Sequence, residues 1–192
     1  ITVTTGKLLV NPVINFTNEG TIKAVGVEIN ATGIFTNEGT IASTSGDVKI
    51  KSASFINGAE KEILAKNMGI DSVTVINAGI LTTSGDLVVN TTGDFISQGK
   101  VEVGSELNIK SQNCTVENEI SAGSIIFEVS SFESFGKINS TENFKLTAKS
   151  IKISGKIEAQ NGELETTEAN SLFGENSENT FTGKLVVTTA TD

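Results

Sequence analysis

A seven-residue phrase occurs twice near the start of this chain and returns in weaker form along most of its length. Residues 16–22 and residues 35–41 both read Phe-Thr-Asn-Glu-Gly-Thr-Ile, and the second copy begins 19 residues after the first. A period of about 20 residues is typical of proteins built from stacked units, each of which is too small to fold alone. This repeat constrains the fold more strongly than any other feature of the sequence.

The weaker copies keep an aliphatic residue at the end of the phrase. Residues 77–81 preserve the Asn-x-Gly-x-aliphatic order, and residues 97–101 preserve it with Ser in place of Asn. Successive closing aliphatic residues are separated by 18 to 22 residues, and they are Ile22, Ile41, Ile63, Leu81, Val101, Ile120, Ile138 and Ile157. The period therefore continues through most of the chain.

Two further sets of apolar residues follow the same period. The first alternates with polar residues as strands do, and consists of Val27/Ile29, Val48/Ile50, Met68/Ile70, Leu87/Val89, Leu107/Ile109, Ile125/Phe127, Phe144/Leu146 and Leu185/Val187. The second is less regular and consists of Ile14/Phe16, Phe35, Phe55, Val73/Val75, Phe95, Val116, Phe132 and Ile151/Ile153. Each period thus contains about three short strands.

The segments between these strands are rich in Gly, Asn, Ser and Thr, which are typical turn residues. We find no sustained apolar pattern with helical periodicity. Residues 59–66 are the one candidate for a short helix, but Ile63 already belongs to a strand column. We therefore expect a strand there, with a loop around residues 58–61 that accounts for the 22-residue gap.

Three strands in each period of 18–22 residues predict an all-β fold, a right-handed parallel β-helix of about nine rungs. Each strand would pair with the equivalent strands one turn above and below. A left-handed coil requires strict hexapeptides and an invariant period of 18, whereas this period drifts. Stacking would also place Asn18 beside Asn37 in an amide ladder and Phe16 beside Phe35 in the interior.

We expect residues 1–192 to form a single β-helix segment, because the period does not break in the middle. The repeat begins at full strength, which suggests a segment excised from a longer chain. Residues 160–181 are weakly patterned, and we expect a loop excursion or an irregular rung there before a last strand at residues 184–187.

Composition excludes several classes of function. The formal net charge is −9, and the chain lacks Arg, His, Trp and Tyr, so we expect no nucleic-acid binding. A catalytic triad or zinc site would need His or clustered Cys. The calcium-binding motifs are also absent, and we interpret Asp47 and Asp86 as turn residues. Cys114, the single cysteine, is expected to be a small buried side chain.

No apolar run approaches 18 residues, so we expect no membrane insertion. We also expect no catalytic, metal or cofactor site and no cofactor. The outward column of the alternating strands is expected to contain Leu9, Glu28, Lys49, Gly69, Val88, Asn108, Ile126, Lys145, Glu165 and Val186. No two carboxylates are adjacent in that column, which favours a solvated face over an active site.

The residues before the closing aliphatics form another outward column. Glu119 lies between Lys100 and Lys137 in it, which predicts ion pairs between rungs. An ice-binding face would need Thr in register over many rungs. Thr21 and Thr40 align, but Glu62 follows them, so we do not favour that function.

The order of residues in the phrase, as in residues 27–41, resembles the filamentous haemagglutinin-like repeats of large bacterial exoproteins. The resemblance covers roughly residues 6–158. It implies a Gram-negative protein that is exported through an outer-membrane secretion barrel by two-partner secretion. Residues 11–14 read Asn-Pro-Val-Ile and depart from the family's Asn-Pro-Asn-Gly secretion motif, so this segment resembles the interior of a shaft.

From this resemblance we expect a non-enzymatic structural or adhesive shaft module, secreted to the bacterial cell surface, that presents other domains for cell contact. Its partner would be an unidentified receptor on a host or neighbouring cell, and the binding residues are unknown. Two alternatives remain open. One is an autotransporter passenger, which has the same fold, and the other is a carbohydrate-active β-helix enzyme.

Overall fold

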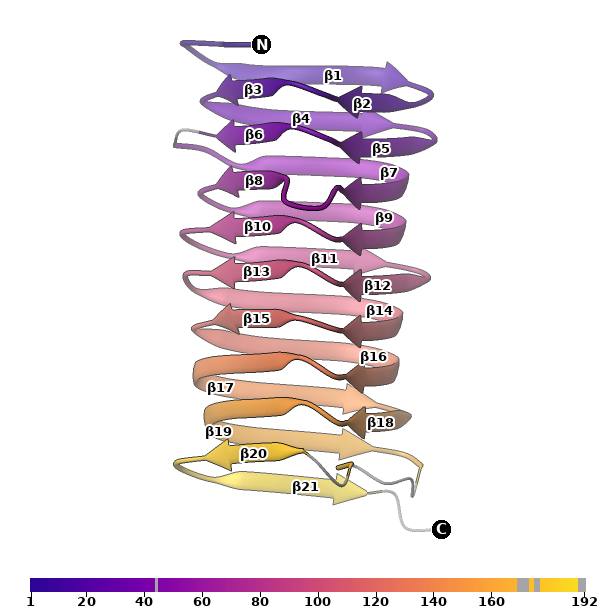
Figure 1. The fold of residues 1–192 in the computed structure, drawn as a ribbon, viewed down its shortest axis with the longest axis vertical. Coiled ribbons are helices and arrows are strands. Elements are labelled where there is room, and N and C mark those ends of the chain that lie inside the picture. The colour runs from indigo at the N-terminus through magenta and orange to yellow at the C-terminus, as the bar shows by residue number, and fades with distance from the viewer. Residues whose placement is uncertain (44, 169–172, 175–176, 190–192) are drawn as a thin grey trace.

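The computed structural model describes residues 1–43, 45–168, 173–174 and 177–189. These residues contain no helix, and all their strand pairings are parallel. The chain winds downwards as a right-handed β-solenoid of about nine turns, crossing the back of the view from left to right and returning across the front (Figure 1). The structure therefore confirms the expected parallel β-helix.

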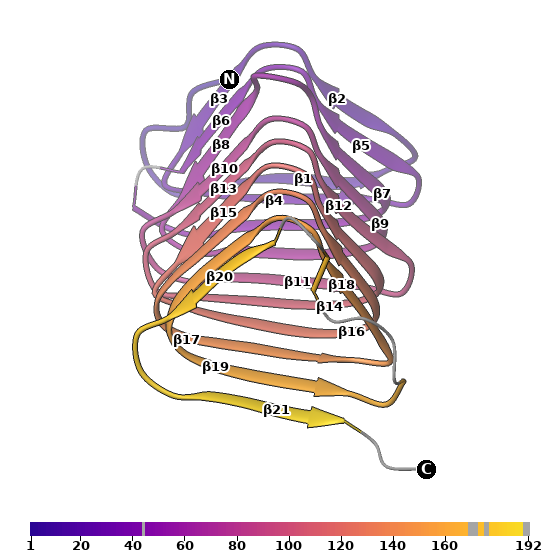
Figure 2. The same ribbon diagram turned by 60° about the horizontal axis from the view of Figure 1, so that its bottom comes forward.

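The solenoid has a triangular outline, which Figure 2 shows from its C-terminal end. We name its three faces A, B and C in the order in which the chain crosses them. Face A contains β1 (Lys7–Val13), β4 (Gly26–Ala31), β11 (Leu87–Thr91) and β21 (Leu185–Thr189). Face B contains β2 (Phe16–Asn18), β5 (Ile34–Asn37), β12 (Asp94–Ser97) and β18 (Ser150–Ile153). Face C contains β3 (Thr21–Ala24), β6 (Thr40–Ser43), β8 (Glu62–Ala65), β10 (Ile80–Thr83), β13 (Lys100–Val103), β15 (Glu119–Ala122) and β20 (Glu178–Phe181).

Six longer strands continue around a corner and contribute to two faces. Four of them run from face A into face B, namely β7 (Val48–Asn57), β9 (Met68–Asn77), β14 (Glu106–Val116) and β16 (Ser124–Ser134). The other two run from face C into face A, namely β17 (Lys137–Ala148) and β19 (Lys156–Thr166). Each of the first eight turns therefore still supplies one stretch of strand to each face.

The closing aliphatic residues form one column inside face C. Ile22 pairs with Ile41, Ile41 with Ile63, and the same register continues to Ile157. All eight residues are at most 1% exposed. The apolar pairs of face A, from Val27/Ile29 to Phe144/Leu146, are buried in the same way. Like residues recur at one period because each stacks on its equivalent in the next turn.

The third column is corrected at Ile14, Val73 and Val116. Ile14 and Val73 are 77% and 52% exposed, so only Phe16 and Val75 of those two pairs belong to the column. Phe95 pairs with Cys114, and Cys114 pairs with Phe132, whereas Val116 lies in the neighbouring inward column beside Ser97. Residues i and i+2 of a strand point to the same side, so spacing alone does not decide which of the two continues a column. Cys114 is 1% exposed, which confirms the expectation of a small buried side chain.

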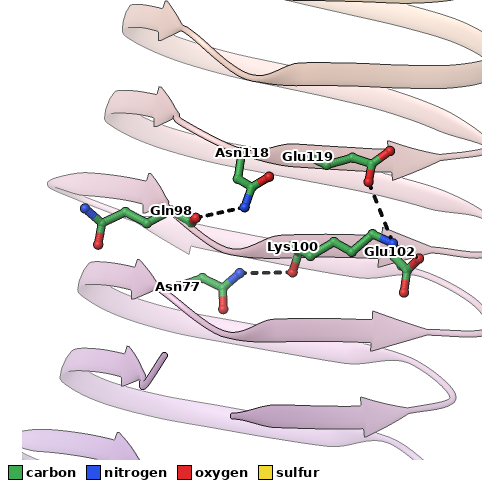
Figure 3. Close-up of polar contacts among 6 residues, drawn as sticks. All are labelled: Asn77, Gln98, Lys100, Glu102, Asn118 and Glu119. Carbon is green, nitrogen blue, oxygen red and sulfur yellow. Dashed lines mark hydrogen bonds and ion pairs between the residues drawn. The ribbon is translucent and has the colours of Figure 1, made fainter. Parts of the chain in front are cut away.

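An amide ladder closes the corner between faces B and C. Asn18 donates to Asn37 over 2.8 Å, Asn37 donates to Asn57 over 2.9 Å, and Asn57 donates to Asn77 over 2.9 Å, each time from Nδ2 to Oδ1. The last amide, Asn77, donates to the Lys100 carbonyl oxygen over 3.1 Å (Figure 3). The expected contact between Asn18 and Asn37 is confirmed, and it extends over four turns.

Phenylalanine rings stack inside face B in the first three turns. The ring centroids of Phe16 and Phe35 lie 5.6 Å apart with planes inclined by 20°, and those of Phe35 and Phe55 lie 5.3 Å apart with planes inclined by 16°. Offset stacking of this kind adds about 0.5–1.5 kcal/mol to the burial of each pair. The stack confirms the expected alignment of Phe16 with Phe35.

The glycine of the repeated phrase is required by close backbone contact between turns. A Cβ atom placed on Gly39 would overlap the carbonyl oxygen of Gly20, and one on Gly99 would overlap that of Gly79. Gly155 has the same relation to Gly136. The Asn-x-Gly order therefore combines an inward amide with a residue whose backbone can lie close to that of the preceding turn.

The longest period contains an inserted turn. The Lys61 amide donates to the Gly58 carbonyl oxygen over 3.1 Å, and Glu60 has a left-handed φ of 63°. Strand β8 begins directly afterwards at Glu62. The expectation of a loop around residues 58–61, followed by a strand in place of a helix, is confirmed.

The stretch 160–181 begins as regular strand. The second half of β19 pairs with β17 up to Thr166, and β20 then pairs with the first half of β19. Residues 169–172 and 175–176 of this stretch lie outside the described residues. The core becomes less apolar here, because Asn179 stands in the column that Ile157 continues, and Leu185 and Val187 are 41% and 42% exposed.

Asn57→Ala should destabilise the chain by about 2–4 kcal/mol, because it leaves buried amide groups of Asn37 and Asn77 without this partner. Urea unfolding followed by far-ultraviolet circular dichroism measures the loss. Asn113→Ala is the matched control, since Asn113 donates to Asp94 at the exposed surface. It should cost less than ~1 kcal/mol. Equal losses in the two variants would contradict a structural role for the buried ladder.

Gly99→Ala should destabilise the chain by about 3 kcal/mol, because the added methyl group forces two turns apart at the Gly79 carbonyl group. Gly69→Ala is the control, since a Cβ atom at Gly69 meets no atom within 4 Å. Its effect should stay below ~1 kcal/mol. The same denaturation experiment compares both variants, and a tolerated Gly99→Ala would refute the requirement for glycine.

Candidate functional site

The outward side of face B carries a ladder of β-branched side chains. The ladder consists of Thr17, Thr36, Ile56, Ile76, Ile96 and Thr115, each in register with the next. Successive members lie ~4.8 Å apart along the solenoid axis. The three isoleucines are partly exposed and form an apolar stripe on the surface.

The surroundings of this stripe are uncharged in the first four turns. No residue of β2, β5 or the face-B segments 52–57 and 72–77 carries a charge. Ile34 and Val73 add exposed apolar area beside the stripe, with 45% and 52% of their surfaces accessible. The backbone groups are used by strand pairing, so this face presents side chains to the surroundings. Sequence analysis missed the stripe, although the isoleucines recur every 20 residues.

Face C carries charged side chains that pair along and between turns. Lys100 contacts Glu102 at 2.7 Å and Glu119 at 3.7 Å (Figure 3). Lys137 instead contacts Glu158 at 3.0 Å. Glu119 therefore pairs with Lys100, as expected. Lys137 does not pair with Glu119 of the preceding turn but with Glu158 of the following turn.

Glu158 is the centre of the second group of ion pairs. It accepts from Lys156 at 2.9 Å as well as from Lys137. The hydrogen bond from Lys156, together with that from Lys137, lowers the pKa of Glu158, and Glu158 raises the pKa of Lys156. These groups are exposed, so each pair contributes little free energy on its own.

The outward column of face A is corrected near its end. Lys145 pairs in register with Glu163, and not with Glu165 as expected from spacing. Gly162 and Leu164 occupy the inward positions of this turn. Because Gly162 is not apolar in the way that its equivalents in the other turns are, the alternating pattern does not reveal this strand register. Lys145 contacts Glu163 at 3.3 Å, and the Thr147 hydroxyl donates to Glu165 over 3.0 Å.

Glu163 and Glu165 are thus two carboxylates on the outward side of one strand. Glu163 lines a hollow of about 360 Å³, whose walls also include Ile126, Lys145 and Val186, whereas Glu165 does not line it. Each carboxylate is held by a side chain of the preceding turn. Glu163 continues the column of Lys145, and Glu165 lies in the neighbouring outward column beside Thr147. A glycosidic mechanism would require such a pair of carboxyl groups to be free to act as acid and base.

Asp47 and Asp86 lie in the turns that lead into face A. Asn67 donates from Nδ2 to Asp47 Oδ1 over 2.9 Å, and the Asp86 amide donates to Asn67 Oδ1 over 3.0 Å. Asp86 Oδ1 in turn accepts from the Glu106 amide over 3.2 Å. Both residues lie in the loops directly before strands, which confirms their expected role. Their hydrogen bonds also join each loop to the equivalent loop of a neighbouring coil of the solenoid.

Two other features bear on chemistry. Burial raises the pKa of the Cys114 thiol, which disfavours the reactive thiolate. Among the described residues, no three His, Cys, Asp or Glu side chains form a group suited to a metal ion. The same residues include no helix that is long and apolar enough to cross a membrane.

Glu158→Gln should reduce the acid sensitivity of stability. The pKa of Glu158 lies below its ordinary value of 4.5 in the folded chain, so its contribution is present above pH ~4.5 and is lost as the pH falls through the lowered value. Urea midpoints between pH ~6 and ~3 should therefore decline less in Glu158→Gln. Glu60→Gln, in an exposed turn outside these ion pairs, should behave as the parent chain, and equal pH profiles for all three would contradict this assignment.

Comparison of the chain with known protein families, with characterised proteins and with solved structures finds no match.

Proposed function

We propose that this chain is a non-enzymatic shaft segment of a secreted bacterial surface protein, which holds other domains at a distance for cell contact. The observation that supports it is the unbroken stacking of the same rung through about nine turns. At ~4.8 Å per turn the stack is roughly 45 Å long. Such a rod has a length that depends directly on the number of repeats.

The way in which the turns are joined suits this role. Every face is held by parallel backbone pairing to the turn above and below, and the interior columns run along the axis. Such a stack resists bending because bending would open hydrogen bonds on one side. The charged side chains of face C pair with one another, which agrees with a surface that keeps the rod soluble.

The resemblance of the repeated phrase to filamentous haemagglutinin-like repeats supports export to the bacterial surface through an outer-membrane barrel. In this proposal the uncharged stripe of face B is the surface that touches a receptor on another cell. Its isoleucines provide apolar area without the desolvation of charges, whereas faces A and C would require ion pairs to be rearranged.

The contact role is tested with beads that carry the chain and are allowed to settle on cultured host cells and on bacterial cells. Ile76→Lys should reduce bead retention at least about tenfold, because it places a charge in the centre of the apolar stripe. Val88→Lys is the control, since Val88 is 39% exposed on face A. Equal retention of both variants, or no retention of the parent chain on any cell, would reject the contact role.

The non-enzymatic assignment is tested on polygalacturonate and on neutral polysaccharides by the release of reducing ends. We expect no release by the parent chain. Cleavage that disappears in both Glu163→Gln and Glu165→Gln would overturn the shaft proposal in favour of a carbohydrate-active enzyme. The Glu142→Gln variant controls for a general effect of removing a surface carboxylate.

A further inference from the structure

We propose that the solenoid contains a break point between its fifth turn (β11, β12 and β13) and its sixth turn (β14 and β15). In this proposal the turns that follow the break point open together while the preceding turns remain folded. The described residues between 7 and 103 then form an N-terminal block, and those between 106 and 189 form a C-terminal block. The boundary is defined by the juxtaposition of Gly99 and Asn118 at the corner between faces B and C.

The first observation is the shortened pairing on face C. Strands β10 and β13 pair over four residues, from Ile80↔Lys100 to Thr83↔Val103. Strands β15 and β17 also pair over four residues. Between them, β13 and β15 pair only at Val101↔Ile120 and Glu102↔Ser121. The backbone ladder is therefore shorter at this boundary than on either side of it.

The second observation supplies a cause for the shortened ladder. The position of Asn118 in the repeated phrase is occupied by glycine in the turns before and after it, at Gly99 and Gly136. At both of those glycines a Cβ atom would overlap backbone of the preceding turn. Asn118 has a Cβ atom, so its backbone cannot come as close to the fifth turn at this corner as Gly99 comes to Gly79 or Gly136 comes to Asn118.

The third observation concerns the interior. The amide ladder ends at Asn77, and the next two members of that column are Ser97 and Val116. The side-chain oxygens of Asn108 and Ser111, both in β14, are buried without a hydrogen-bond partner among the described residues. A third such atom, Ser134 Oγ, lies one turn further on in β16. Unsatisfied polar atoms weaken a fold, and two of these three occur in the first strand after the boundary.

The side-chain contacts that cross the boundary lie at the surface. Figure 3 shows Asn118 Nδ2 donating to the Gln98 carbonyl oxygen over 3.3 Å, and Lys100 beside Glu119 at 3.7 Å. On face B, Asn113 donates to Asp94 over 2.7 Å. Exposed contacts of these kinds contribute little to stability, so they do not replace the missing backbone pairing.

A stack of this kind can divide because each turn contacts only its neighbours. The stability of such an array is approximately the sum of the turns and of the interfaces between them. One weak interface then separates two cooperative units with different opening free energies. The C-terminal block should open first, because its last turn also has the exposed Leu185 and Val187.

Thiol labelling of the full chain under native conditions tests this proposal. Three variants are prepared in a Cys114→Ala background, namely Ala65→Cys, Ala122→Cys and Ala159→Cys. The three alanines belong to the same inward position of face C and are 3%, 5% and 6% exposed. Their surroundings are thus matched, and each labelling rate is normalised to that of the same variant in urea.

Ala122→Cys and Ala159→Cys should label at equal normalised rates, because both lie in the C-terminal block. Ala65→Cys should label at least about tenfold more slowly. Equal rates at all three positions would overturn the proposal in favour of global opening. Faster labelling at Ala159→Cys than at Ala122→Cys would overturn it in favour of gradual fraying.

A repair variant tests the cause. Asn118→Gly should slow the labelling of Ala122→Cys to within about twofold of Ala65→Cys, because it lets the sixth turn approach the fifth. Glu117→Gly is the matched control, since it adds the same flexibility at the neighbouring exposed position. Labelling that Asn118→Gly leaves unchanged or accelerates would reject Asn118 as the origin of the break point.

Discussion

The parallel pairing of each turn with the next is the interaction on which the rest of this structure depends. It brings equivalent residues to ~4.8 Å from one another along the axis, so every position of the repeat lies against the same position of the next turn. Amides therefore meet amides at Asn18 and Asn37, and rings meet rings at Phe16 and Phe35. The same closeness demands a glycine at positions such as Gly99, where the backbone of one turn touches that of the next.

Small departures from the repeat consequently have local effects. Asn118 in the place of a glycine shortens one ladder, and Gly162 in the place of an apolar residue leaves room that the Phe181 and Leu185 side chains occupy. Neither change alters the path of the chain, because the neighbouring turns still supply partners on both sides. A solenoid can therefore vary in strength along its length while it keeps one shape. In a shaft, the stiffness and the length therefore depend on all the turns together. The position at which the stack opens depends on the weakest interface between two turns.

Much of the fold could be predicted from the sequence, because the period and the alternation of apolar residues are visible in it. The closing aliphatic column from Ile22 to Ile157 is an example, and the structure places each member as expected. The errors arose where a turn lacked the usual signal. Val116 was placed where Cys114 belongs, and Glu165 where Glu163 belongs, since a strand repeats every two residues and a shift of two preserves the pattern. The stripe at Ile76 escaped notice because spacing does not distinguish an outward isoleucine from an inward one.

The sequence by itself determined the stacked architecture, its approximate number of turns and the identity of the buried columns. These properties follow from periodicity, which is a local feature of the chain. Only the tertiary structure decided which side chains share the outer faces, including the uncharged ladder of face B and the ion pairs around Glu158. The reason is physical: an inward position is specified by the need to exclude water, whereas an outward position tolerates many residues, so its neighbours become known only when the register of the turns is known.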